Sequence, residues 1–279
     1  MRRLLVLGAA VAAVGLVAGT GLAGGPAPGV MVAGGGVVAP GGAVRYVAYT
    51  RGAGTVVTAV LTASGRTARW GWLKGSYGVP MIAFDGTTDG LTSDGKTLVL
   101  ASPPYTGPPP YSAAVSHFAI LDTRTLRLRT AVSLRGMFAY DAISPDAKTL
   151  YLIEYMQDSD QIRYRVRAYD LAAHRLLRRV VADPQEWADS MVGSPIARAT
   201  GPGGRWVYTL YANPGAPFIH ALNAVQRKAV CIDLPWRGSD EWLTKMQLTL
   251  NGNATRLVVH PRGGNAVLVV NTKTLRVLP

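Results

Sequence analysis

The chain has 279 residues, 48% hydrophobic and 16% charged, so it can bury the core of one large domain and is not a disordered polymer. Its 32 glycines and 18 prolines are typical of many short strands joined by tight turns. The single cysteine excludes an intramolecular disulfide and, with only four scattered histidines, a Cys/His zinc site. Asp158 and Asp160 could ligate calcium together with Asp189, but Asp-x-Asp is common in polar loops, so no metal is expected, and no cofactor either.

The N-terminus has the parts of a secretory signal peptide. Arg2 and Arg3 form a positive region, residues 4–17 are uncharged and apolar, and small residues follow. We therefore expect residues 1–23 to be removed and the chain to be secreted or extracytoplasmic, in the cell envelope. Because residues 4–23 could just span a bilayer at about 20 residues, an uncleaved anchor stays open. The formal net charge is +13, or +11 without Arg2 and Arg3, and for an exported chain it favours an anionic wall polymer or membrane surface over nucleic acid.

A spacer and one β domain are expected next. Residues 24–42 are rich in Gly, Pro, Ala and Val and carry no charge, which is typical of a spacer, although residues 30–38 could add an edge strand. Residues 43–279 show no sustained hydrophobic period of 3.6 residues, so helices should be minor. We therefore expect residues 43–279 to form the folded domain.

Two markers recur along this domain with the same period. The first is a tight turn in front of an apolar strand, and its central residues Gly95, Ala147, Gly204 and Asn253 are 52, 57 and 49 residues apart. The second is the residue that opens a turn between two later strands. Its copies are Asp122, Asp170, Asn223 and Asn271, with steps of 48, 53 and 48 residues.

The two markers predict four strands in each repeat of about 50 residues, which is the pattern of a β-propeller blade. Residues 56–61 followed by 66–72 give a fainter first copy. The sequence therefore predicts an all-β fold, a β-propeller of five blades with four antiparallel strands each. A β-sandwich with regular hairpins is the alternative.

The clearest repeat also resembles a known family. Residues 144–152 (SPDAKTLYL), followed by 167–171 (RAYDL) and 177–181, resemble the YVTN/WD40-like repeats of bacterial extracytoplasmic propellers, and residues 93–100 are similar. The resemblance covers residues 79–279 and weakens in the last two repeats. It implies a propeller fold and no single activity.

On one predicted face of the propeller, every turn that can be placed carries a basic residue. These turns join the first strand to the second and the third to the fourth, and their basic residues are Lys96, Arg124, Lys148, Arg175, Arg205, Lys228, Arg256 and Lys273. They could dock on an anionic wall or membrane, in which case adsorption should fall with salt and after neutralising Arg124, Lys148 and Arg175. Ordinary turn solubility explains the same residues.

The opposite predicted face gathers carboxylates and aromatic rings. A Glu-Trp pair recurs 55 residues apart in what should be the same loop of neighbouring blades. The candidate ligand residues on this face are Tyr105, Tyr111, Glu186, Trp187, Asp189, Asp240, Glu241 and Trp242. Aromatic rings beside carboxylates suit a carbohydrate or a cationic group. The repeated tryptophans could equally be blade-to-blade packing residues.

The function predicted from these features is an extracytoplasmic module that binds or scaffolds a protein, an envelope polymer or a small ligand. A propeller hydrolase or lactonase with its site on the same loop face is the alternative. The sequence has no Gly-x-Ser-x-Gly, His-Glu-x-x-His or phosphate-loop motif, and it identifies no catalytic residue.

Overall fold

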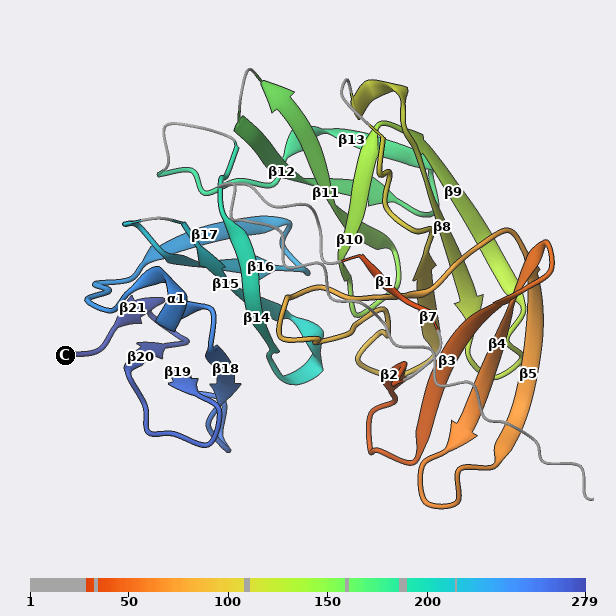
Figure 1. Cartoon of the computed structure of the whole chain (residues 1–279), viewed down its shortest axis with the longest axis horizontal. Coiled ribbons are helices and arrows are strands. Elements are labelled where there is room, and N and C mark those ends of the chain that lie inside the picture. The colour runs from red at the N-terminus through yellow and green to blue at the C-terminus, as the bar shows by residue number, and fades with distance from the viewer. Residues whose placement is uncertain (1–28, 33–34, 108–110, 159–160, 186–189, 214) are drawn as a thin grey trace, which may run out of the picture.

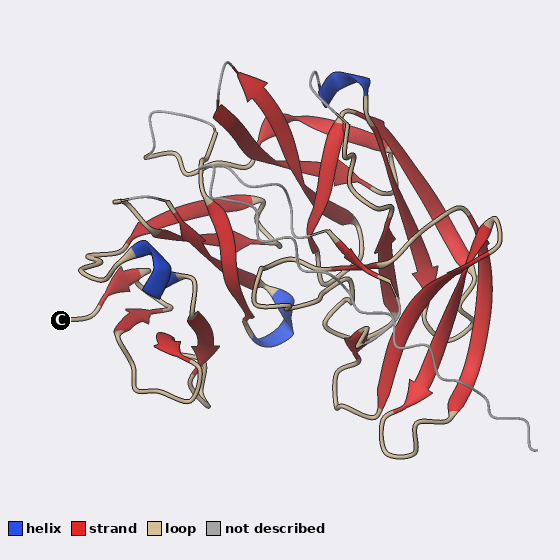
Figure 2. Ribbon diagram, viewed as in Figure 1, coloured by secondary structure: helices blue, strands red, loops and turns tan. Residues whose placement is uncertain are grey.

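The computed structural model describes residues 29–32, 35–107, 111–158, 161–185, 190–213 and 215–279, and nearly all of its regular structure is β-strand (Figures 1 and 2). The expected signal peptide lies outside the described residues. Within the described part, no helix is long and apolar enough to cross a membrane.

Five antiparallel sheets, which we call blades, follow one another along the chain. Blade 1 consists of β2 (Val37–Val38), β3 (Val44–Arg51), β4 (Gly54–Leu61) and β5 (Thr67–Lys74). Blade 2 has three regular strands, β7 (Thr97–Ala101), β8 (Val115–Asp122) and β9 (Leu128–Arg135). Its first strand is replaced by an irregular segment in which Leu91 pairs with Leu98. The strand β2 falls within residues 24–42, so part of the expected spacer belongs to blade 1.

Blades 3, 4 and 5 each have four strands in chain order. Blade 3 consists of β10 (Met137–Ile143), β11 (Thr149–Asp158), β12 (Gln161–Asp170) and β13 (Arg175–Val180). Blade 4 consists of β14 (Ser194–Thr200), β15 (Trp206–Ala212), β16 (Phe218–Asn223) and β17 (Lys228–Asp233). Blade 5 consists of β18 (Met246–Leu250), β19 (Arg256–Pro261), β20 (Leu268–Asn271) and β21 (Arg276–Val277).

Left-handed turn residues explain why the repeat is visible in the sequence. In the turn between the third and fourth strands, an Asp or Asn side chain accepts a hydrogen bond from the backbone N–H three residues on, as Asp122 does from Thr125 at 2.9 Å. The residue four positions after this Asp or Asn has positive φ in all four copies, which are Leu126, His174, Arg227 and Leu275. The left-handed residues between the first and second strands are Gly95, Ala147, Gly204 and Ala254. In blade 5 the marker is therefore one residue later than Asn253.

Hydrophobic clusters fill the spaces between neighbouring blades. Four of them join blades 1 and 2, 2 and 3, 3 and 4, and 4 and 5. Between blades 3 and 4, for example, the buried Tyr151 donates a hydrogen bond from its Oη to the carbonyl oxygen of Ala224 at 2.8 Å. Among the described residues, no such cluster combines blade 5 with blade 1, and Figure 1 shows the ring open between these two blades.

Residues 78–92, which we call the axial segment, pass through the centre of the ring (Figure 1). The segment includes β6 (Val79–Pro80), which pairs with β1 (Val30–Met31). It then reaches blade 4, where the N–H of Phe84 donates to the carbonyl oxygen of Pro195 at 2.9 Å. The axial segment thus connects blade 2 to blade 4 across the axis. A regular first strand of blade 2 would not make this connection.

Candidate functional site

A buried ionic cluster lies beside the axial segment. Arg198 on β14 donates to the backbone carbonyl oxygen and the Oδ1 of Asp141 on β10, and its Nε donates to Thr209 at 3.0 Å. Its Nη1 also lies 3.9 Å from the Oδ2 of Asp89 in the axial segment. The side chains of Arg198 and Asp141 are only 3% and 2% exposed. One guanidinium therefore holds together blade 4, blade 3 and the segment that belongs to blade 2.

The repeat register places the three charged residues of this cluster at one position. Asp89, Asp141 and Arg198 each stand six residues before the left-handed residue that follows the first strand of their repeats. Sequence reasoning missed them because it sorted the turns and treated the innermost strands as apolar. The signal was present: a charged residue recurs at one position of three consecutive repeats, and in β10 and β14 its neighbours are mostly apolar. The corresponding residue in blade 5 is Leu248, which packs in a hydrophobic cluster.

The electrostatics of the cluster follow from its burial. Burial raises the pKa of the Asp89 carboxyl, against the opposing effect of Arg198. Burial alone would lower the pKa of Arg198, but the carboxylates of Asp141 and Asp89 outweigh it, so its pKa is raised. Burial also raises the pKa of Tyr140 well above its ordinary range, with a further contribution from Asp89. At neutral pH the cluster thus contains a charged guanidinium beside a neutral hydroxyl.

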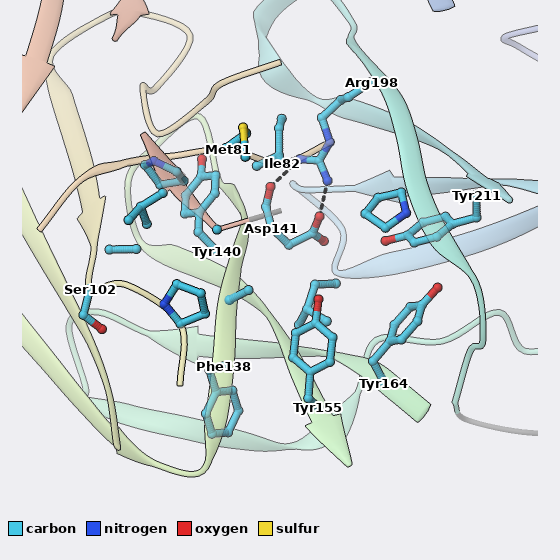
Figure 3. Close-up of a pocket in the computed structure, with 18 of the residues that line it drawn as sticks. Met81, Ile82, Ser102, Phe138, Tyr140, Asp141, Tyr155, Tyr164, Arg198 and Tyr211 are labelled. Atoms are coloured by element: carbon cyan, nitrogen blue, oxygen red, sulfur yellow. Dashed lines mark hydrogen bonds and ion pairs between the residues drawn. The ribbon is translucent and has the colours of Figure 1, made fainter. Parts of the chain in front are cut away.

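Tyrosines surround a small cavity next to this cluster (Figure 3). Its walls include Tyr140, Tyr155, Tyr164 and Tyr211, and its volume is about 30 Å³. The hydroxyls of Tyr140 and Tyr164 and the Oδ2 of Asp141 are buried without a hydrogen-bond partner among the described protein atoms. Since one water molecule needs roughly 10–15 Å³ measured in this way, the cavity has room for about two, and these polar atoms suit them.

The axial cluster is therefore suited to holding the ring together, and its cavity is too small for an organic substrate. Within the described part of the chain, no group of three or more His, Cys, Asp or Glu side chains could hold a metal ion. The chemistry available is that of a charged hydrogen-bond network that connects three blades.

The predicted ligand residues on the described part of the carboxylate and aromatic face lie in two separate places. Tyr105 and Tyr111 are half-buried and pack against the hydrophobic cluster between blades 3 and 4. Asp240, Glu241 and Trp242 lie in the short helix α1 (Asp240–Leu243) of blade 5, on the other side of the ring (Figure 1). The structure does not bring these two groups together. Glu186, Trp187 and Asp189 lie outside the described residues.

The tryptophan of α1 has a partner that sequence reasoning missed. The rings of Trp236 and Trp242 have centroids 5.1 Å apart at an interplanar angle of 33°, and Trp242 is 39% exposed. Both line a groove of about 350 Å³ with Val267 and Leu268. This aromatic groove is formed by the connection between blades 4 and 5 together with residues 267–268 of blade 5.

The predicted basic residues lie in the turns or at the adjoining strand ends of blades 2 to 5. They are Lys96, Arg124, Lys148, Arg175, Arg205, Lys228, Arg256 and Lys273. In blades 2 and 3 an aspartate of the same turn approaches the lysine: Lys96 lies 3.3 Å from Asp94, and Lys148 lies 3.8 Å from Asp146. In blade 5 the turn has Asn253 at the corresponding position.

No family model and no curated protein matches the sequence. Among solved structures, an oligogalacturonate lyase in complex with manganese is 12% identical with a TM-score of 0.52, and the alignment covers 88% of this chain and 63% of that one. The fold is a β-propeller. Hydrazine synthase from Kuenenia stuttgartiensis is 14% identical with a TM-score of 0.45, covering 93% of this chain and 81% of that one. The Dos1 propeller is 9% identical with a TM-score of 0.46, covering 86% and 54%.

The chain spans less than two thirds of the lyase chain, and at these identities the likeness shows the fold alone. Membership of the YVTN repeat family stays a prediction, because no family model matches.

Proposed function

We propose that this propeller is an exported binding module of the cell envelope that holds an anionic polymer on its outer surface. The observation that carries the proposal is the occupied axis. The axial segment runs through the centre of the ring, hydrogen-bonds to blade 4, and leaves a cavity of about 30 Å³. This cavity has room for about two water molecules, so we place the polymer outside the axis.

Export and charge support an anionic envelope polymer as the ligand. The N-terminal sequence has the parts of a signal peptide, and without its two arginines the formal net charge of the chain is 13 − 2 = +11. A basic protein outside the cell meets anionic wall polymers and membrane surfaces, and long-range attraction concentrates it there.

A hydrolase or lactonase is the second candidate, and one observation favours it. The unpaired hydroxyls of Tyr140 and Tyr164 lie near the Arg198–Asp141 pair, so polar groups do converge at the axis. In this case the axial segment would have to leave the centre of the ring before a substrate could enter.

Adsorption and turnover distinguish the two candidates. The purified protein is mixed with isolated bacterial cell walls at increasing NaCl, and the bound fraction is measured; separately, it is incubated with a panel of lactones and esters. The proposal predicts saturable adsorption that weakens as salt rises, with no turnover. Absence of adsorption at low salt would contradict it. Turnover that Tyr140→Phe abolishes, while the fold is kept, would assign the axis to catalysis instead.

A further inference from the structure

The net positive charge of the chain comes mainly from the parts of the sequence that border the opening of the ring. All sixteen Asp and Glu residues lie between Asp85 and Glu241. Residues 29–84, which contain β1, blade 1 and the start of the axial segment, have five Arg or Lys and no carboxylate. Residues 242–279, which form most of blade 5, likewise have five Arg or Lys and no carboxylate. The opening is thus bordered on both sides by cationic chain.

Blade 1 has one face packed on blade 2 and one free face. Alternation along its strands places Tyr46, Ala48 and Val57 in the cluster shared with blade 2. Arg69, on the same side, donates from its Nε to the carbonyl oxygen of Thr123 in blade 2 at 3.1 Å. The intervening residues of β3, β4 and β5 therefore point to the opposite side, toward the opening.

The edge strand β5 carries two tryptophans on the free face of blade 1. Cross-strand pairing aligns Tyr49, Val56 and Trp72 in one row, and the next row contains Thr58 and Trp70. Trp70 is 67% exposed and Trp72 is 54% exposed. Two tryptophans at alternate positions of one strand stand about 6.6 Å apart. Large exposed aromatic residues at this density mark a binding surface.

Glycine and cations complete this surface. The six-membered ring of Trp72 occupies the space that a Cβ on Gly54 would need, so the glycine allows the ring to lie against the sheet. Arg51 and Lys74 flank Gly54 in the same cross-strand row. Trp70, Trp72 and Lys74 also line a groove of about 620 Å³ between β5 and residues 125–128 of blade 2, so this groove borders the free face and is not part of it.

Blade 5 does not offer a partner for this surface. The face it turns away from blade 4 carries Thr249 and His260, which are hydrogen-bonded at 3.0 Å, and Arg256 at its edge. Packing this polar, cationic face of blade 5 on the free face of blade 1 would bring positive charges on both faces together. A second copy of blade 1 packed on the same face would also bring positive charges together. Charge thus favours an anionic occupant over either of these.

We infer that the free face of blade 1, with Trp70, Trp72, Arg51 and Lys74 as its main contacts, binds an anionic polysaccharide. This inference rests on the proposed function and names the site and the polymer class. The apolar faces of sugar rings pack on indole rings, while the two cations pair with carboxylate or sulfate groups of the chain. Single-stranded nucleic acid presents similar chemistry, but an exported protein meets polysaccharide.

Calorimetric titration of the purified protein with alginate, a linear uronate polymer, tests the stacking contribution. Dextran serves as the neutral polymer and oligothymidine as the nucleic acid. We expect alginate to bind, dextran not to bind, and Trp70→Ala/Trp72→Ala to lose affinity by on the order of tenfold or more. Trp242→Ala, which removes the predicted ligand tryptophan of α1, tests the competing site: a loss of alginate binding in this variant that Trp70→Ala/Trp72→Ala does not show would overturn the inference. Because both tryptophans are more than half exposed, folding should survive, which circular dichroism checks.

A charge-matched pair of variants tests the cations. Arg51→Gln/Lys74→Gln and Arg124→Gln/Lys148→Gln each remove two positive charges, and only the first pair should weaken alginate binding strongly. A larger loss in the second pair would place the site on the basic turns and overturn this inference, as would tighter binding of oligothymidine. Binding to alginate and cell walls that is unchanged by the tryptophan variants would refute this site alone. No binding to either polymer would refute the proposed function with it.

Discussion

Replacing Arg198 with Met tests whether the axial cluster holds the propeller together. The change keeps an unbranched apolar stem but removes the guanidinium and its charge, which leaves the carboxylates of Asp141 and Asp89 buried without their partner. Removing one member of a buried ion pair costs about 3–5 kcal/mol, because the remaining charge loses its partner and cannot reach water. For a chain of this size, that corresponds to a fall in Tm on the order of 10 °C.

Urea denaturation at pH 7 measures this loss. Arg198→Met/Asp141→Leu should recover at least half of it, because an apolar pair needs no compensating charge. The pH dependence gives an independent check through Asp89, whose pKa burial already raises. Without Arg198 that pKa should rise further. A carboxyl whose pKa is raised in the folded state lowers the stability of the protein as pH increases, because it must then ionise where it is buried. The stability deficit of Arg198→Met relative to wild type should therefore shrink as pH falls from 7 to about 4. A variant within about 1 kcal/mol of wild type at pH 7 would refute the role of the cluster.

Three further predictions concern single sites. Hydrogen bonds from Arg129 and from the N–H of Thr125 lower the pKa of Asp122 to about 2. The contribution of Asp122 to stability is therefore present above about pH 4 and lost as pH falls toward 2. Asp122→Asn should remove this part of the acid unfolding transition followed by circular dichroism. Burial lowers the pKa of His220, so the stability of the protein should fall as pH drops below about 6.5, by at most about 1.4 kcal/mol per pH unit. For His220→Gln, urea denaturation between pH 5 and 7 should show no such slope. Gly71→Ala would place a Cβ 2.6 Å from a backbone oxygen of blade 2 and should cost about 1–3 kcal/mol in urea denaturation, whereas Gly252→Ala, which meets nothing within 4 Å, should stay within about 0.5 kcal/mol of wild type.

The repeat could be predicted from the sequence because its markers are local. Asp122 and its equivalents accept hydrogen bonds from their own turns, and the residues that follow adopt left-handed backbone wherever they lie in the fold. Such turns fix the ends of the flanking strands, so the strand order within blades 3, 4 and 5 follows from residue spacing.

Features that depend on distant parts of the chain were not predictable in this way. The axial segment replaces the first strand of blade 2 because it hydrogen-bonds to Pro195 of blade 4, more than a hundred residues away. Predicting the ionic cluster of Asp89, Asp141 and Arg198 required knowing that the first segments of their repeats face a shared axis. The opening beside blade 1 also escaped prediction, although the absence of carboxylates from residues 1–84 was a visible signal.

Hydrogen–deuterium exchange with and without alginate is the most direct test of where this propeller binds its ligand. Amides report protection strand by strand, so the outer face and the axis can be compared in one experiment. The account predicts slower exchange in β3 and β5 of blade 1 when alginate is present, with the axial segment unchanged. Protection confined to the axial segment and β10 would contradict it and place the ligand at the axis.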